Sequence, residues 1–517
     1  MRSVLQQMAA VIVSFLALAA FAFAQSATTS LHGTVYDAKG AVVSGATVTI
    51  TNPATGFTRT VKSDNQGGYQ FPELQPATYE LSANASGFAT VKETGIQLLV
   101  NTPGTVNVTM QVSGGVVTVE VAGAAPMVNT VNAALGHAFD TEQIADLPFE
   151  GRDPTGILSL QPGVAYTGNS QHISSASDSR SGAVDGARSD QTNVTLDGVD
   201  NNDQTLGTAF QGALRVPLDS LQEFKVTTAS SDADTGRSSG GQVSLVTKSG
   251  TNGVHGGAYI YNRSDIGEAN DWFSEQAQVN SNLPNSPPHL VRNTFGGFVG
   301  GPIIKDRLFF FADYEGGRLH QNLQVTRIVP SDNLRNGIIS YPCTQDPACP
   351  SSGVNQLGPA DLAAMDPNCT GLGTCPNGPG PNPAVMAIFQ KYPHPNTDSV
   401  GDGLNYRGFT FSSPLPQKLD AYVAKLDYNA TRNGNHRIFL RGVLDADRTA
   451  LSSDPTSLTG DGGSQFPGDP ANRSQVNTSK GLSVGYTATL SNTLINDFRF
   501  GYVRQSLDTL GQQSQHF

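Results

Sequence analysis

The sequence predicts a mainly β protein made of several parts. Short segments in which apolar and polar residues alternate recur along the chain, as expected for strands with one buried face. Glycine is abundant, with 56 of 517 residues, and charged residues make up only 14% of the chain, against roughly 25% in ordinary soluble domains. A chain of this length has room for several domains of about 100–200 residues. We expect four consecutive parts, residues 1–24, 25–112, 113–253 and 254–517.

The first 24 residues are typical of an export signal. Arg2 provides a positive charge, residues 8–23 are apolar, and Ala22-Phe23-Ala24 places small residues at the cleavage positions. The alternative is a membrane anchor, but the apolar run is shorter than the about 20 residues that a spanning helix needs. We predict cleavage after Ala24. No other long apolar run follows, which leaves a soluble secreted protein or a transmembrane β-barrel.

Charge and cysteine content narrow the function classes. The formal charge is −12, so the clustered positive charge of a nucleic-acid-binding surface is not expected. The four cysteines form two C-x5-C pairs, Cys343 with Cys349 and Cys369 with Cys375, inside a proline-rich stretch. We predict two local disulfides, consistent with export. A zinc site is the alternative, but the spacing differs from C-x2–4-C and no histidine lies between the first and last cysteine. No cofactor is expected.

Residues 25–112 are predicted to form a small β-sandwich of short strands joined by turns such as residues 37–40. The stretches "GTVYDAKG", "SGATVTI", "DNQGGYQF" and "ASGF" closely resemble the carboxypeptidase regulatory-like domain. Catalysis is not implied, because none of the nine histidines has a glutamate three residues later. We expect a structural or docking module.

Residues 113–253 mix strand and helix patterns. The run "GGVVTVEVAG" at residues 114–123 predicts a linker strand, and an exposed strand of this kind could pair with a partner protein through its free edge. The apolar spacing that follows predicts a short helix up to Leu147. These patterns indicate a small α+β domain.

Three motifs in this region resemble functional sites. Ser238 lies in a G-x-S-x-G sequence, but a strand rather than a helix follows it, which favours a turn over a hydrolase nucleophile. Asp197, Asp200 and Asp203 are candidate calcium ligands, although their spacing departs from the calcium loop and Asx turns are the alternative. Lys248 begins the sequence "KSGT", which resembles part of a phosphate-binding loop. The glycine that directly precedes the lysine in such a loop is missing. We expect residues 248–257 to join two β domains, with a boundary near residue 253.

Several longer motifs resemble the plug and first barrel strands of TonB-dependent outer-membrane receptors, in particular the Oar-like group that carries an N-terminal carboxypeptidase regulatory-like domain. They are "LPFEGRDPTGILSLQPGV", "LDGVDNND", "SLQEFKVTT", "TGRSSGGQVSLVTKSGTNGVHG", "ANDWF" and "NTFGGFVGGPIIKDRLFFFADYEGGR". The resemblance implies a plug at residues 113–253, a barrel from residue 254, and a periplasmic sandwich. It also implies active, non-enzymatic uptake that depends on TonB, with a small molecule, glycan or peptide as substrate and lipid around the barrel.

Residues 254–517 contain about eight strand-like segments, among them "DRLFFFADYEGG" and "QVTRIV" as separate strands, and the long connection of residues 331–418 is expected as an external loop. Tyr422, Leu426 and Tyr428 share one face of such a segment, and Lys425 and Asp427 share the other. The apolar face would form the core of a soluble sandwich or would face lipid in a barrel. Because plugged transporters close with about 22 strands, we expect the N-terminal part of a longer or split receptor. The alternative is a secreted or cell-surface adhesion protein that binds carbohydrate or matrix.

Overall fold

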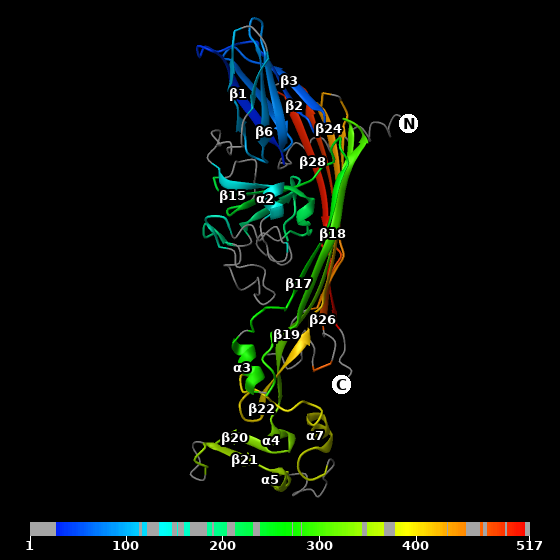
Figure 1. Ribbon diagram of the computed structural model, residues 1–517. Helices are drawn as coiled ribbons and strands as arrows, with labels where there is room; N and C mark the ends of the chain where they lie inside the picture. Colours follow the sequence, from blue (N-terminus) through cyan, green and yellow to red (C-terminus); the bar gives the residue numbers. More distant parts are fainter. Residues whose placement is uncertain are drawn as a thin grey trace, which may run out of the picture.

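A computed structural model gives the fold of the chain (Figure 1). The residues that it describes are 27–112, 116–120, 134–146, 152, 160–165, 183–188, 191–203, 212–230, 238–270, 272–280, 282–343, 349–366, 378–431, 433–450, 466–468, 473–491 and 494–511. The predicted export signal, residues 1–24, lies outside this part of the chain. The architecture is mainly β, as predicted.

The N-terminal part is a two-sheet structure, called the sandwich below. One sheet contains β1 (Thr29–Asp37), β4 (Gly68–Leu74), β7 (Gly104–Thr105) and β8 (Val108–Met110). The other has the order β3 (Phe57–Lys62), β2 (Thr47–Asn52), β5 (Ala77–Asn84), β6 (Thr90–Leu98) and β9 (Val116–Glu120). Alternating apolar residues such as Val48, Ile50 and Leu81 fill the space between the sheets, because successive strand residues point to opposite faces.

The next part, called the inner unit, is built on a five-stranded sheet. Its order is β10 (Leu135–Asp140), β15 (Leu221–Ala229), β16 (Gln242–Thr247), β13 (Asn193–Leu196) and β14 (Val199–Asp200). Helix α2 (Thr141–Asp146), the short helix η4 (Leu218–Ser220) and the pair β11 (Val164–Ala165) and β12 (Ala183–Val184) complete its described elements. The predicted helix up to Leu147 corresponds to α2.

The C-terminal part is an eleven-stranded sheet, called the wall. Its main path is β17 (His255–Ser264), β18 (Leu290–Ile304), β19 (Leu308–Pro330), β23 (Gln417–Asn429), β24 (His436–Asp445), β27 (Lys480–Thr489) and β28 (Ile495–Arg504). All neighbours on this path are antiparallel. Strands β22 (Tyr406–Pro414), β25 (Asp447–Ala450), β26 (Arg473–Asn477) and β29 (Leu507–Gly511) extend it.

The prediction of separate strands at "DRLFFFADYEGG" and "QVTRIV" is wrong. Both belong to β19, a single strand of 23 residues. Its first half pairs with β23, and its second half pairs with β22. Gly316 and Gly317 lie inside it and remain within the antiparallel ladder with β18. A pair of glycines inside a strand therefore does not end it here.

Side-chain exposure identifies which face of the wall is covered. On β23, Tyr422 is 46% and Leu426 40% exposed, whereas Val423 is 2% and Lys425 6% exposed. Tyr422 and Leu426 thus point outward, whereas Lys425 and the smaller apolar residue Val423 point toward the inner unit. Large apolar side chains on the outside and charged side chains inside are typical of a sheet that faces lipid and encloses a polar interior. In a soluble sandwich the large apolar side chains would instead be buried.

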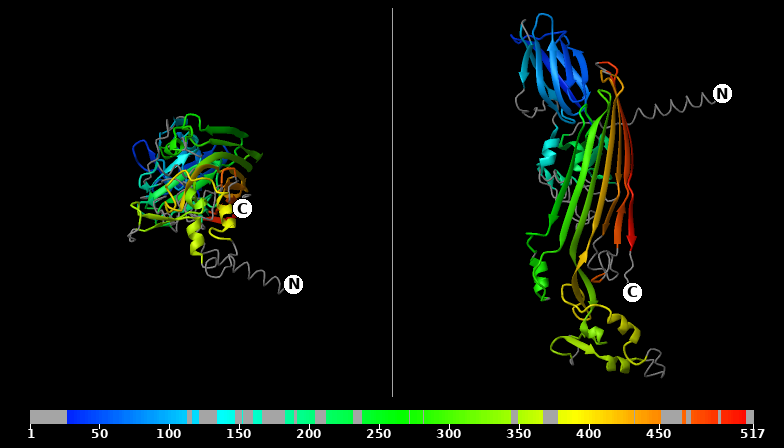
Figure 2. Two further views of the ribbon diagram at one scale, coloured as in Figure 1. Left: turned by 90° about the horizontal axis from the view of Figure 1, so that it is seen from below. Right: turned by 45° about the vertical axis from the view of Figure 1, so that its right-hand side comes forward.

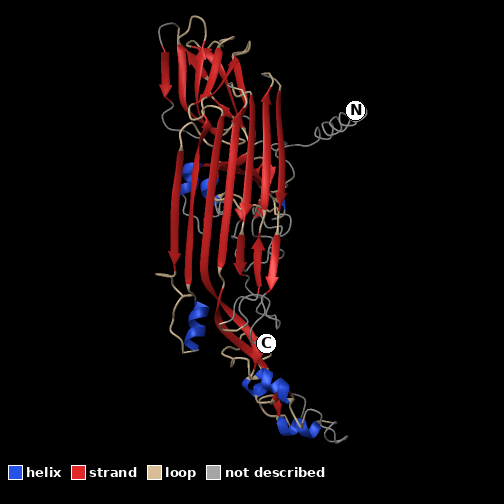
Figure 3. Ribbon diagram, turned by 90° about the vertical axis from the view of Figure 1, so that its right-hand side faces the viewer, coloured by secondary structure: helices blue, strands red, loops and turns tan. Residues whose placement is uncertain are grey.

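The two ends of the wall differ. One end carries short turns and the sandwich, and the other carries the long excursion of residues 331–418 (Figures 1 and 2). This excursion, expected as a loop, contains α4 (Asp332–Arg335), β20 (Ile339–Pro342), β21 (Val354–Leu357), α5 (Pro359–Met365), α7 (Pro383–Phe389) and β22. Helix α3 (Trp272–Asn280) lies toward the same end. Figure 3 shows the long wall strands side by side between these ends. No described helix is long and apolar enough to cross a membrane.

Candidate functional site

The inner unit and the wall are joined by residues 248–254. β16 ends at Thr247 and β17 begins at His255, so a strand lies on each side of the connection, unlike in a phosphate-binding loop. Gly250 passes so close to the wall that a Cβ atom there would lie 2.3 Å from the carbonyl oxygen of Phe310. The ammonium group of Lys248 lies 4.6 Å from the centre of the Phe298 ring. The lysine of the "KSGT" motif therefore contacts the wall.

Asp197 forms the first of two ionic clusters between the inner unit and the wall. It follows β13 and is 3% exposed. Its Oδ2 accepts from Arg441 Nε at 3.1 Å and from Thr247 Oγ1 at 2.8 Å, and its Oδ1 accepts from the Thr247 N–H at 3.0 Å. Lys425 Nζ lies 3.6 Å from Oδ1. Burial acts to raise the pKa of this carboxyl, but the two wall cations and the Thr247 hydrogen bonds hold it below its ordinary value.

The register of the wall explains why this carboxylate is needed. Lys425 on β23 and Arg441 on β24 are direct cross-strand partners, and like charges in such positions destabilise a sheet. Both are almost fully buried. Asp197 lies against both cations and compensates part of their charge, so the inner unit reduces the repulsion within the wall.

The structure does not bring the candidate calcium ligands together. Asp197 contacts the wall cations. Asp200 accepts hydrogen bonds from Asn202 N–H and Nδ2 at 2.8 and 2.7 Å. Asp203 accepts a hydrogen bond from Gln505 Nε2 at 2.9 Å. Among the described residues, no group of three or more His, Cys, Asp or Glu side chains is placed to hold a metal ion. Asp197 thus contacts the wall, and the contacts of Asp200 agree with the Asx-turn alternative.

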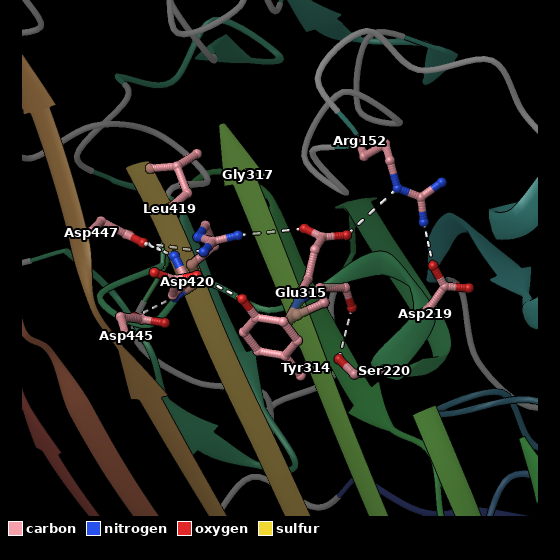
Figure 4. A network of polar contacts seen from close by, with 12 residues as sticks. Arg152, Asp219, Ser220, Tyr314, Glu315, Gly317, Leu419, Asp420, Asp445 and Asp447 are labelled. Atoms are coloured by element: carbon pink, nitrogen blue, oxygen red, sulfur yellow. Dashed lines mark hydrogen bonds and ion pairs between the residues drawn. The ribbon is translucent and has the colours of Figure 1, made fainter. Parts of the chain in front are cut away.

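The second ionic cluster has the opposite polarity (Figure 4). Here the inner unit supplies the cations Arg152 and Arg215, and the wall supplies the carboxylates. Arg215 Nη2 lies 3.1 Å from Asp447 Oδ1 and Arg215 Nη1 lies 3.4 Å from Glu315 Oε1. The Arg215 N–H also donates to Asp445 Oδ2 at 3.0 Å. Arg152 pairs with Asp219 and lies 3.5 Å from Glu315 Oε2 through its Nε.

The two clusters lie at different levels of the same strands. Lys425 is opposite Phe311 on β19, whereas Glu315 is opposite Ala421, four residues further along. At about 3.3 Å per residue, the clusters are separated by roughly 13 Å along the strands. Within these two clusters the wall cations lie nearer the sandwich and the wall carboxylates nearer the 331–418 excursion, and the inner unit presents the complementary charges. Two further buried carboxylates of the wall, Asp313 and Asp427, lie close to the level of Lys425.

Apolar contacts accompany the ionic ones. Val423 and Val443 of the wall belong to the same buried cluster as Val194, Leu214 and Phe224 of the inner unit. Glycines in β27 and β28 allow close approach, because a Cβ on Gly481 would lie 2.4 Å from Leu214 and a Cβ on Gly501 would lie 2.0 Å from Val199. The inner unit therefore fits a surface of the wall that is both charged and shaped for it.

The remaining candidate residues lie elsewhere. Ser238 Oγ donates to the carbonyl oxygen of Gln191 and accepts from the Gly240 N–H at 3.0 Å, and β16 follows it, so the turn alternative describes its contacts. A disulfide joins Cys343 and Cys349 in the excursion, with Cα atoms 5.5 Å apart. The predicted pair Cys369 and Cys375 lies outside the described residues.

Comparison with known proteins identifies the family. The model of the outer membrane beta barrel domain matches residues 246–517, more than half of the chain. The chain belongs to the outer membrane beta barrel family. A model of the carboxypeptidase regulatory-like domain matches residues 30–111. Membership in this family places the protein in the outer membrane, as the sequence motifs predicted.

Among curated proteins, the TonB-dependent transporter Oar of Myxococcus xanthus is 28% identical over 328 residues, which cover 60% of this chain and 28% of Oar. The chain thus spans just over a quarter of the length of this relative. The resemblance to the Oar-like group of TonB-dependent receptors is confirmed by this match together with the two family models. Oar itself is a transporter.

Two solved outer-membrane proteins are also similar. The transporter YddB of Escherichia coli is 12% identical, with a TM-score of 0.40, and the match covers 72% of this chain and 39% of YddB. The ferric enterobactin receptor PfeA of Pseudomonas aeruginosa is 13% identical, with a TM-score of 0.39, over 72% of this chain and 41% of PfeA.

Proposed function

We propose that this protein is a TonB-dependent transporter that moves an unidentified substrate inward across the outer membrane. In this proposal the inner unit is the plug of the barrel, and the wall forms part of the barrel itself. The observation that carries the proposal is a sheet of the inner unit held by two buried ionic clusters against the polar face of a wall whose other face exposes apolar side chains. When the two surfaces separate, water can hydrate the charges that were paired. An interface held by ion pairs is therefore suited to opening.

The ends of the wall suggest the direction of transport. Short turns are typical of the periplasmic side of outer-membrane barrels, and long connections are typical of the external side. We place the sandwich in the periplasm and the excursion of residues 331–418 outside, where a small molecule, glycan or peptide would first bind. Active transport then requires the plug to rearrange so that the substrate passes between plug and wall.

The energy-coupling partner in this proposal is TonB, which would act from the periplasm. β9 is the edge strand of a sandwich sheet and pairs with β6 in parallel. An edge strand can be extended by a strand of a partner protein through main-chain hydrogen bonds. We assign the TonB contact to residues 116–120, immediately before the chain enters the inner unit.

In vivo cysteine cross-linking tests this assignment. Single cysteines at residues 116–120 are expected to form disulfides with a cysteine-substituted TonB in cells that make the full-length protein. Thr60→Cys on β3, the opposite edge strand of the same sheet, is the matched control and is expected to stay uncross-linked. Equal cross-linking at both edges, or none at residues 116–120, would contradict the proposal.

A further inference from the structure

The sandwich contacts the inner unit through two buried ionisable side chains on one strand. Glu223 and Lys225 project from β15 toward the turn at residues 99–102 of the sandwich. Glu223 Oε1 accepts from the Val100 N–H at 2.7 Å, and Lys225 Nζ donates to the carbonyl oxygen of Asn101 and to Thr102 Oγ1 at 3.0 Å. Glu223 is 1% and Lys225 7% exposed. Two buried side chains are thus used to hold one turn of another part of the chain.

A second set of contacts joins the same sandwich to the wall and the joint. The Asn252 N–H donates to the carbonyl oxygen of Ala54 at 2.8 Å. Arg437 of β24 donates through Nη2 to the carbonyl oxygen of Glu73. The ring of Phe57 lies against Gly434, where an added Cβ would come within 2.3 Å of it. The sandwich therefore bridges two surfaces that must separate if the inner unit is to move.

The junction of the three parts is joined by hydrogen bonds and is incompletely packed. A cavity of about 300 Å³ lies there, lined by residues of all three, among them Tyr79 of the sandwich, Thr247 of the inner unit and Arg437 of the wall. Most of the contacts described above reach main-chain atoms of the sandwich. Polar interfaces of this kind resemble those of transient rather than permanent complexes, so the docking is suited to release.

We infer that the sandwich is a strap, which ties the inner unit to the wall and must undock before the inner unit can leave its two ionic clusters. This inference rests on the proposed function, because it assigns a regulatory role to the sandwich of a transporter. In this inference the sandwich, which we place in the periplasm, helps to keep the inner unit closed against the wall. Undocking would break the Glu223 and Lys225 contacts first and expose the ionic clusters afterwards.

The test measures hydrogen–deuterium exchange of β13 in the purified full-length protein. The sandwich contacts β15, and β16 separates β15 from β13 in the sheet. Protection of the β13 amides from exchange therefore reports on the inner unit as a whole. The hydrogen bond between Asn252 and Ala54 places their Cα atoms within about 6.7 Å, which a disulfide can span. The oxidised Ala54→Cys/Asn252→Cys variant is expected to exchange more slowly at β13 than the same sample after reduction.

Matched variants separate the strap from general stabilisation. A Thr49→Cys/Thr60→Cys disulfide joins two cross-strand partners inside the sandwich and should leave β13 exchange unchanged. Lys225→Met removes a charged donor to the turn and should speed exchange about tenfold, whereas Lys39→Met, on an exposed turn, should not.

Each outcome decides the inference. Unchanged β13 exchange in both the oxidised Ala54→Cys/Asn252→Cys variant and Lys225→Met would overturn it, as would equal slowing by the disulfide inside the sandwich. If Lys225→Met fails to fold, the oxidised and reduced forms of the Ala54→Cys/Asn252→Cys variant still give the answer. The measurement needs neither TonB nor a substrate, so failure of the TonB cross-linking experiment would be seen separately.

Discussion

Replacing Asp197 by asparagine tests whether the first ionic cluster holds the inner unit in place. The substitution keeps the size of the side chain and suits the left-handed backbone at this position, where φ is 51°, because asparagine adopts that region more readily than most residues. The carboxylate that faces Arg441 at 3.1 Å and Lys425 at 3.6 Å is lost. Two buried cations on neighbouring strands are then left facing each other.

The expected cost follows from this geometry. Breaking a buried ion pair by removing one partner costs about 3–5 kcal/mol, and we expect the lower value because asparagine can still accept a hydrogen bond from Thr247. About 3 kcal/mol corresponds to a roughly hundredfold increase in opening. Hydrogen exchange at the Thr247 amide, which donates to Asp197, measures it directly.

Two comparisons make the result decisive. Asp200→Asn, the same substitution at an exposed position of the adjacent turn, should change exchange by less than about threefold. The double variant Asp197→Asn/Arg441→Met should cost less than the sum of the single variants, because contacting charges are coupled. Exchange within threefold of the wild type in Asp197→Asn, or strict additivity in the double variant, would refute the reasoning.

Three further predictions follow from other contacts. Burial raises the pKa of Glu223 to about 8, so between about pH 5 and 8 the native protein holds a proton that the unfolded chain, with a pKa near 4.5, has released. The free energy of unfolding should therefore fall by up to about 4–5 kcal/mol as the pH rises through this range. Glu223→Gln should abolish that fall in thermal unfolding measured across the same range. Arg215→Met removes the cation that faces the wall carboxylate Asp447 and should cost about 3 kcal/mol in urea unfolding of the inner unit. Arg263→Met, which removes an exposed ion pair, should cost less than about 1 kcal/mol. Cys343→Ser opens a loop of sequence separation 6 and should cost the excursion about 2 kcal/mol, seen as faster limited proteolysis there with unchanged exchange at β13.

The wall could be predicted from local pattern, and its contacts could not. Alternation around Tyr422 and Lys425 predicted a strand with two chemically different faces, and only the fold showed that the apolar face points outward. The motifs placed the joint at residues 248–257, because glycine-rich connections between strands are a local signal. The 23-residue length of β19 was missed, because the stretch "RLHQNL" separates the apolar runs of its two halves.

The ionic clusters were missed for a different reason. Asp197 lies more than 220 residues before Lys425 and Arg441, and nothing in either segment alone indicates the pairing. The aspartates of "DGVDNND" resembled a metal loop because they are close in sequence, yet their side chains turn to three different partners. Glu223 and Lys225 alternate with apolar residues as solvent-facing residues would, but another part of the chain covers them.

The reversed polarity of the two clusters restricts how the inner unit can move. A slide of roughly 13 Å toward the sandwich would bring Arg152 and Arg215 to the level of Lys425 and Arg441. The opposite slide would bring Asp197 to the level of Glu315 and Asp445. Either translation therefore replaces attraction by repulsion. The charges therefore oppose translation of the inner unit along the barrel axis. We expect the inner unit to tilt or partly unfold rather than to move out as a rigid body along that axis.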